Sequence, residues 1–154
     1  MTVATRDAYF AAHLGHGAGG RIVDWRLASQ GMSDETIFAT VESAAGAREE
    51  LAIRRYRPDG VARELADVER QYRLLRALAG SGVPVAEVLW HEPADEPLGS
   101  PFFVMRRVPG HVPVPWSPEG RKFLAAAGDG AIGREFVAIL ARIHSLDWRA
   151  RGLD

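Results

Sequence analysis

The spacing of hydrophobic residues along the chain is first typical of strands, then of a helix, and then of strands again. This order limits the folds that the chain can adopt. Three short segments rich in β-branched and apolar residues come first, which predicts three strands joined by turns. Over residues 61–79 the apolar residues recur at spacings of three and four with charges between them, which predicts an amphipathic helix. Two more strand-like segments follow. The five expected strands are residues 22–28, 35–42, 50–56, 86–92 and 101–108.

This order of elements predicts an α+β fold. The short connections between the first three strands favour an antiparallel meander. Gly80 and Gly82 end the helix, and Pro84 prevents its continuation. We therefore expect a five-stranded antiparallel sheet with one packed helix.

A proline-rich stretch marks the expected domain boundary. Residues 109–117 contain three prolines, which predicts an extended connector. Two helices are expected after it, at 118–127 and 131–146, and a short helix near the N-terminus at 7–14. The expected domains are an N-terminal helix and linker at 1–21, a sheet domain at 22–108, a linker at 109–117 and the first helices of a second domain at 118–154.

Composition narrows the function classes. Hydrophobic residues make up 47% of the 154 residues and charged residues 25%, which is typical of a globular chain. The net charge of −1 gives no general attraction to nucleic acid or to an anionic membrane, so neither is an expected partner. No apolar run is long enough to cross a bilayer. The absence of cysteine excludes disulfides and thiolate chemistry, and together these features favour a cytoplasmic location.

Two motif-like patterns are set aside. Gly15, Gly17 and Gly20 match a dinucleotide-binding fingerprint, but a strand should precede that motif and a helix should follow it, whereas here a strand follows. His13 and His16 could share a helical face, yet no third ligand is evident, so we expect no metal site.

Six segments in order resemble the aminoglycoside phosphotransferases, which belong to the protein-kinase-like fold. The resemblance is strongest to the branch similar to the kinase-like domains attached to acyl-CoA dehydrogenases, and it covers roughly residues 22–154. It implies that residues 22–108 form the small lobe, and that a linker and the start of the helical large lobe follow. The segments are GMSDETIF at 31–38, LAIRR at 51–55, RQYRLLRAL at 70–78, GVPVAEVL at 82–89, PLGSPFFVMRRVPG at 97–110 and LARIHSLDW at 140–148.

The resemblance implies that the turn between the first two strands lies over nucleotide phosphates. Gly31 would allow close backbone approach, and Met32 or Ser33 would donate hydrogen bonds to phosphate oxygens, although a plain hairpin turn would use the same residue types. Asp34 stands where the family usually has asparagine. A carboxylate there would repel phosphate by ~1 kcal/mol at water-like screening, unless it points away from the ligand.

The third strand should supply the cation for the phosphates. Most kinases use lysine, but the matching position here is Arg54, and a guanidinium can bind phosphate in a bidentate way. Strand alternation sends Arg54 and Arg55 to opposite faces, and both could instead be solvated charges. The helix carboxylate that pairs with this cation in kinases is replaced by Gln71, so Gln71 or Glu64 is the expected partner of Arg54.

The last expected strand resembles the hinge between the lobes. An adenine would bond the backbone near Met105 and Arg107. The cofactor implied is ATP, or another nucleoside triphosphate, with Mg²⁺, expected only for a full two-lobed protein. A small-molecule hydroxyl acceptor is implied for the same form.

The family's H-x-D-x-x-x-x-N catalytic loop and its later magnesium-binding aspartate match nothing within residues 1–154. No catalytic residue is therefore assigned, and we expect negligible phosphotransferase activity from these residues alone. The chain is expected to be the nucleotide-binding portion of an ATP-dependent small-molecule phosphotransferase. The alternative is a non-catalytic nucleotide-binding or self-associating module, with a homodimer formed through exposed C-terminal helices.

Overall fold

The computed structural model describes residues 2–17, 19–30, 34–57, 67–110, 113–128 and 130–153. The chain forms two compact units. The first contains Met1–Arg76 and Ala86–Arg107, and the second contains Ala77–Val85 and Val108–Asp154.

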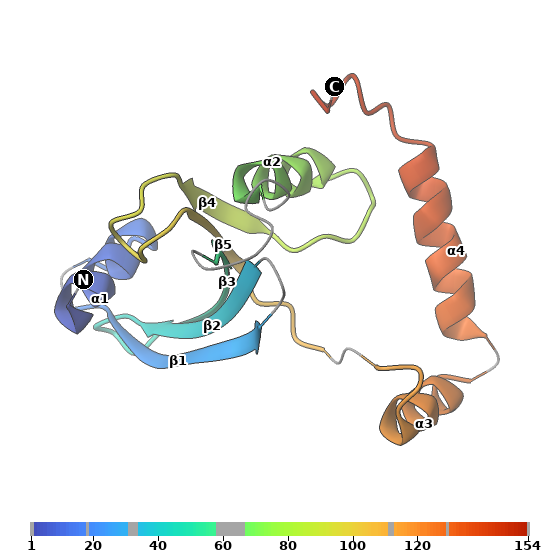
Figure 1. The fold of residues 1–154 in the computed structure, drawn as a ribbon, viewed down its shortest axis with the longest axis horizontal. Coiled ribbons are helices and arrows are strands. Elements are labelled where there is room, and N and C mark those ends of the chain that lie inside the picture. Colours follow the sequence, from blue (N-terminus) through green and yellow to red (C-terminus); the bar gives the residue numbers. More distant parts are fainter. Residues whose placement is uncertain are drawn as a thin grey trace. The chain divides into compact units, whose positions relative to one another are not determined.

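A five-stranded antiparallel sheet forms the frame of the first unit (Figure 1). The strand order is β1-β2-β3-β5-β4, so the first three strands form a meander and β5 lies between β3 and β4. The expected five-stranded antiparallel sheet is confirmed. The strands are β1 (Arg21–Gln30), β2 (Asp34–Glu42), β3 (Arg48–Tyr56), β4 (Val88–Glu92) and β5 (Phe102–Arg106).

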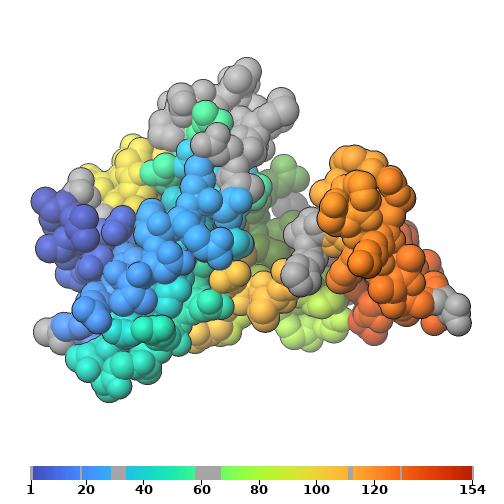
Figure 2. Space-filling view, turned by 90° about the horizontal axis from the view of Figure 1, so that it is seen from below, coloured from blue at the N-terminus to red at the C-terminus, as the bar shows by residue number. Residues whose placement is uncertain are grey.

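β1 is the edge strand beside β2. Its side chains are mostly exposed through Ala28, and they form part of the visible surface of this unit, in light blue (Figure 2). This exposure explains why its sequence does not alternate cleanly between apolar and polar residues.

Helix α1 (Val3–His13) packs against one face of the sheet, which we call the α1 face. The helix begins earlier than the sequence pattern predicts, because Thr2 caps it by accepting a hydrogen bond from the Thr5 backbone N–H at 3.3 Å. Phe10 is completely buried among apolar strand residues. The buried cluster on this face consists of Phe10, Ile37, Ala39, Val41, Leu51, Ile53, Phe102 and Val104.

Helix α2 (Val68–Leu78) packs against the opposite face, which we call the α2 face. Val68, Tyr72 and Leu75 contact Tyr56 and Phe103, as the spacing of apolar residues in the sequence predicts. The residues next to the α1-face residues along each strand have their side chains on the α2 face, because successive side chains of a strand alternate between faces. Counted over the described residues, this second cluster has three buried members and is the smaller of the two.

The second unit contains helices α3 (Pro118–Ala126) and α4 (Ala131–His144). Ser117 caps α3 by accepting a hydrogen bond from the Gly120 N–H at 2.9 Å. A Cβ atom at Gly120 would lie 1.9 Å from the Val114 carbonyl oxygen, so only glycine fits there. No described residue of α4 is buried.

Apolar side chains on α4 are exposed, among them Phe136 at 66% and Val137 at 62%. Self-association through this surface stays a prediction. In the described part of the chain, every helix is too short or too polar to cross a bilayer.

Candidate functional site

The strand register places a row of side chains across the α2 face. Phe38 lies beside Ala52, and Ala52 lies beside Met105. The neighbouring row runs from Thr36 through Arg54 to Phe103 in the same way. Residues from three strands therefore form one continuous surface on the side of the sheet that α2 partly covers.

Arg54 is held at two points on this surface. Its Nη1 donates to the Thr36 hydroxyl at 3.1 Å, and its Nη2 donates to Asp34 Oδ2 at 3.0 Å. The Arg54 side chain remains 36% exposed, whereas the Asp34 side chain is only 3% exposed. A buried carboxylate thus fixes a guanidinium that still reaches solvent, and this arrangement can bind an anion.

Gln71 also bonds Asp34. Its Nε2 donates to Asp34 Oδ2 at 3.1 Å, so Gln71 and Arg54 share one acceptor oxygen. Gln71 therefore reaches Arg54 through Asp34, and among the described contacts no direct hydrogen bond joins the two side chains. Glu64, the other expected partner, lies outside the described residues.

Asp34 connects Arg54 with Gln71, and this link was not predicted from the sequence. Asp34 was expected to repel phosphate unless it points away from the ligand; in the structure it is buried at the start of β2 and accepts two hydrogen bonds. The available signal was strand alternation, which puts Asp34 and Thr36 on the face of β2 that also carries Phe38. The pairing of β2 with β3 was also needed, and single-strand patterns do not give that register.

Arg55 points to the opposite face. Its Nε donates to Glu35 at 3.0 Å and its Nη1 to the Leu98 carbonyl at 2.7 Å. These contacts leave Arg55 with a structural role, so Arg54 is the arginine of this pair that lies on the α2 face.

Ala52 lies between Phe38 and Met105 in this row and is only 5% exposed, so the three side chains form an apolar strip on the α2 face, which we call the apolar floor. Arg107 lies at one side of this floor, with its guanidinium carbon 4.6 Å from the centre of the Phe38 ring. Its Nη1 also donates to Glu50 at 3.1 Å. Met105 and Arg107, both predicted from the sequence, therefore lie on the same surface as Arg54. Gly31, Met32 and Ser33 lie outside the described residues.

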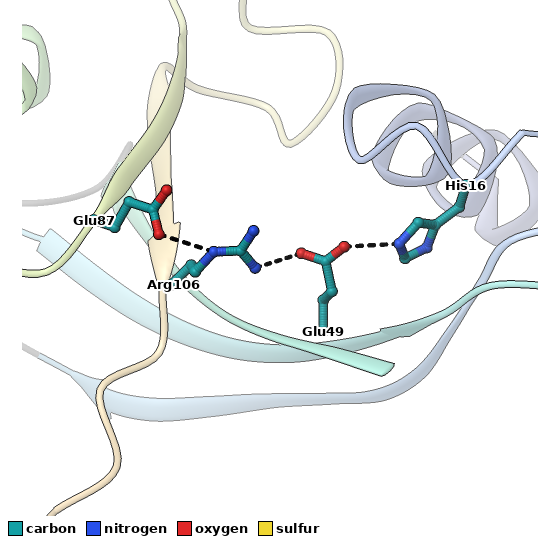
Figure 3. A network of polar contacts seen from close by, with 4 residues as sticks. All are labelled: His16, Glu49, Glu87 and Arg106. Carbon is teal, nitrogen blue, oxygen red and sulfur yellow. Dashed lines mark hydrogen bonds and ion pairs between the residues drawn. The ribbon is translucent and has the colours of Figure 1, made fainter. Parts of the chain in front are cut away.

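A separate polar network ties together the α1 side of the sheet (Figure 3). His16 Nε2 lies 2.8 Å from Glu49 Oε1, Arg106 also bonds Glu49, and the Arg106 Nε donates to Glu87 at 2.9 Å. Burial raises the pKa of Glu49, but the hydrogen bonds from Arg106 and His16 outweigh it and leave that pKa below its ordinary value. This network anchors the segment after α1 to β3 and β5.

Tyr9 of α1 makes a second anchor on the α1 side. Its hydroxyl donates to Glu92 at 2.9 Å and accepts from the Trp90 indole N–H at 3.1 Å. Burial, and then the hydrogen bond to Glu92, raise the pKa of Tyr9 well above its ordinary value.

The two histidines considered for a metal site have other contacts. His13 stacks on Trp90 with ring centres 4.8 Å apart, and His16 pairs with Glu49. Among the described residues, no group of three or more histidine, aspartate and glutamate side chains is arranged to hold a metal ion.

Comparison with known proteins shows the family to which the chain belongs. The model of the phosphotransferase enzyme family (APH) matches residues 24–154. The chain therefore belongs to the phosphotransferase enzyme family, and the resemblance expected from the sequence is confirmed.

Two curated mouse proteins are similar. Acyl-CoA dehydrogenase family member 10 is 37% identical over 87 residues, which are 56% of this chain and 8% of that protein. Acyl-CoA dehydrogenase family member 11 is 29% identical over 150 residues, which are 96% of this chain and 18% of that protein. The chain thus spans less than a fifth of the length of each mouse relative.

A solved structure shares the fold. The crystal structure of a candidate aminoglycoside phosphotransferase from Ralstonia eutropha JMP134 matches with a TM-score of 0.61 at 24% identity. The match covers 95% of this chain and 40% of that one.

Proposed function

We propose that this chain is the nucleotide-binding portion of an ATP-dependent phosphotransferase that acts on a hydroxyl of a small molecule. The observation that carries the proposal is the hold on Arg54 by Asp34 and Thr36 on the α2 face. Family membership supports the reaction class. Phosphoryl transfer depends mainly on holding and neutralising the phosphates, and a fixed, partly exposed arginine suits that task.

The floor beside Arg54 supports an adenine site. A planar base packs against apolar side chains, and Phe38, Ala52 and Met105 provide an apolar strip beside Arg54. The backbone at the end of β5, near Met105 and Arg107, would supply hydrogen bonds to the base edge. The base and the phosphates would then lie along β3, two residues apart at Ala52 and Arg54.

Other parts of the reaction require groups beyond this surface. The proposed cofactor is ATP with Mg²⁺, which would neutralise phosphate charge when bound. The turn containing Gly31, Met32 and Ser33, which were selected from the sequence, would lie over the phosphates. The acceptor would be a small molecule with a hydroxyl group, and its identity does not follow from the α2 face.

The test is calorimetric titration of the purified protein with MgATP. We expect binding, and we expect Arg54→Ala to weaken it at least about tenfold, the effect of losing charge-assisted hydrogen bonds. Arg48→Ala is the matched control, because Arg48 is on the same strand but is 65% exposed and pairs with Glu42. Absence of binding at millimolar MgATP, or equal losses in both variants, would overturn the proposal.

A second candidate is a self-associating module without catalysis. The exposed apolar side chains of α4 favour it, because such surfaces are usually covered in a stable protein. Sedimentation equilibrium tests this candidate. A dimer that dissociates on Phe136→Asp, together with no affinity for MgATP, would favour it over nucleotide binding.

A further inference from the structure

We infer that Asp34 is a positioning residue for Arg54, and that a β2 carboxylate thereby takes over the role of the helix carboxylate whose aligned position Gln71 occupies. The inference rests on the proposed nucleotide site. It concerns how the phosphate-binding guanidinium is oriented when the helix offers only the neutral Gln71 at the aligned position.

The burial of Asp34 gives the first argument. The residue is 4% exposed, and charged side chains are seldom buried so fully unless they are paired. Its Oδ2 receives both Arg54 and Gln71. Its Oδ1 is buried and has no hydrogen-bond partner among the described residues. Burying this carboxylate costs free energy, and its ion pair with Arg54 is the contact that offsets the cost.

The donors of Arg54 give the second argument. A guanidinium has five N–H groups, and here one on Nη1 goes to Thr36 and one on Nη2 goes to Asp34. The Nε is buried and lacks a partner within the described part of the chain. One N–H on each Nη therefore has no partner among the described residues and remains for a ligand such as a phosphate.

Gln71 completes the arrangement from the helix. Its amide N–H fixes the same oxygen that holds Arg54, so α2 acts on the arginine through Asp34. A charge-assisted bond to a carboxylate is stronger than one to a neutral amide, which explains why the carboxylate contacts Arg54 directly and the glutamine does not.

A positioning role and a simple charge effect of Asp34 predict opposite changes in phosphate affinity when Asp34 is replaced. If Asp34 acted only as a nearby negative charge, its removal would strengthen the binding of an anionic phosphate. If Asp34 positions Arg54, its removal weakens phosphate binding although the site becomes more positive.

The experiment compares MgATP with adenosine, which lacks phosphates, in calorimetric titrations of the wild type, Asp34→Asn, Arg54→Ala and the double variant. We expect Asp34→Asn to weaken MgATP binding about tenfold and to leave adenosine affinity unchanged. In the Arg54→Ala background the same change should no longer weaken MgATP binding, because the group that Asp34 positions is gone and only the charge effect remains. Circular dichroism melting checks that each variant is folded at the titration temperature.

Each outcome decides one question. Equal or tighter MgATP binding by Asp34→Asn overturns the positioning role while leaving the proposed function intact. Matched losses for MgATP and adenosine also overturn it, because they indicate general damage to the fold. If the wild type binds neither ligand, the proposed function fails and the inference fails with it. Should Asp34→Asn not fold, Gln71→Leu replaces it, with a smaller loss expected for MgATP alone.

Discussion

The two faces of the sheet differ in what their side chains do. On the α1 face, Phe10 and seven strand residues form a continuous buried apolar cluster. Among the described residues of the α2 face, three form a smaller buried cluster, and polar residues such as Asp34 and Arg54 lie near the small Ala52. Both faces are made by the same strands, so the difference arises from alternate residues and not from different elements.

The contrast shows how one strand can serve stability and binding together. Ile53 is completely buried on the α1 face, while its neighbour Arg54 is partly exposed on the α2 face. A buried charged group and a small residue on the second face contribute less to stability than packed apolar residues would. We therefore expect substitutions on the α1 face to change the free energy of unfolding, and substitutions on the α2 face to change ligand affinity.

The largest effect is expected for Phe10→Ala. Removing a fully buried ring creates a cavity in the α1-face cluster and should lower the free energy of unfolding by about 3–5 kcal/mol. Urea unfolding measures this change, with Val3→Ala as the control because Val3 is 66% exposed on the same helix. Equal effects of the two substitutions would show that α1 does not contribute to the core.

A smaller effect, on affinity, is expected for Ala52→Leu. The larger side chain would fill the floor between Phe38 and Met105 and should weaken adenosine binding about tenfold. The expected cost in unfolding free energy is about 1–3 kcal/mol, the usual result of overpacking. Ala39→Leu, at a buried position on the α1 face, should lower stability without acting on the ligand directly. Unchanged adenosine binding by Ala52→Leu would place the base elsewhere.

Tyr9→Phe should lower the free energy of unfolding by about 1–3 kcal/mol. The substitution removes the hydroxyl that bonds both Glu92 and Trp90. The Glu92 carboxylate then loses a hydrogen-bond donor, and the Trp90 indole N–H loses its acceptor. MgATP affinity should not change, since Tyr9 belongs to the α1 side. Urea unfolding and titration on the same samples check both statements, and a loss of affinity with retained stability would break the division between the faces.

The smallest effect is a pH dependence from Glu49. Because its pKa is lowered in the folded protein, the charged form stabilises the fold above the unfolded pKa, and this contribution is lost as the pH falls through the folded pKa. The contribution should be under about 1 kcal/mol, since Arg106 is 47% exposed and screened by solvent. Glu49→Gln should flatten the acidic limb of the stability profile by that amount. An unchanged acidic limb would mean that the network with Arg106 and His16 adds nothing.

The sequence was sufficient for the order of elements and the antiparallel sheet. Local sequence patterns predicted these elements. Helical spacing of apolar residues predicted α2, and β-branched segments predicted the strands before it. The early start of α1 was missed because Thr2 acts as a cap outside the apolar pattern. Strand ends also extend beyond the predicted bounds, as at Arg21 and Arg48, where Glu42 pairs with both arginines.

The site was predicted in part. Arg54 and Gln71 were selected from the sequence, but the residue that connects them was not. The connection depends on the register between β2 and β3 and on where α2 meets the sheet, and both are set by contacts far apart in the chain. A charged residue expected to oppose ligand binding thus became its proposed support.

The central claim is that the nucleotide binds on the α2 face. Methyl NMR spectra recorded during titration with MgATP test it most directly, because the methyl groups of Ala52 and Met105 lie on the α2 face, whereas those of Ile53 and Val104 lie on the α1 face. We predict that the Ala52 and Met105 signals move with ligand concentration while the Ile53 and Val104 signals stay nearly fixed. Shifts confined to Ile53 and Val104, or no shift at any of the four at millimolar MgATP, would contradict the claim.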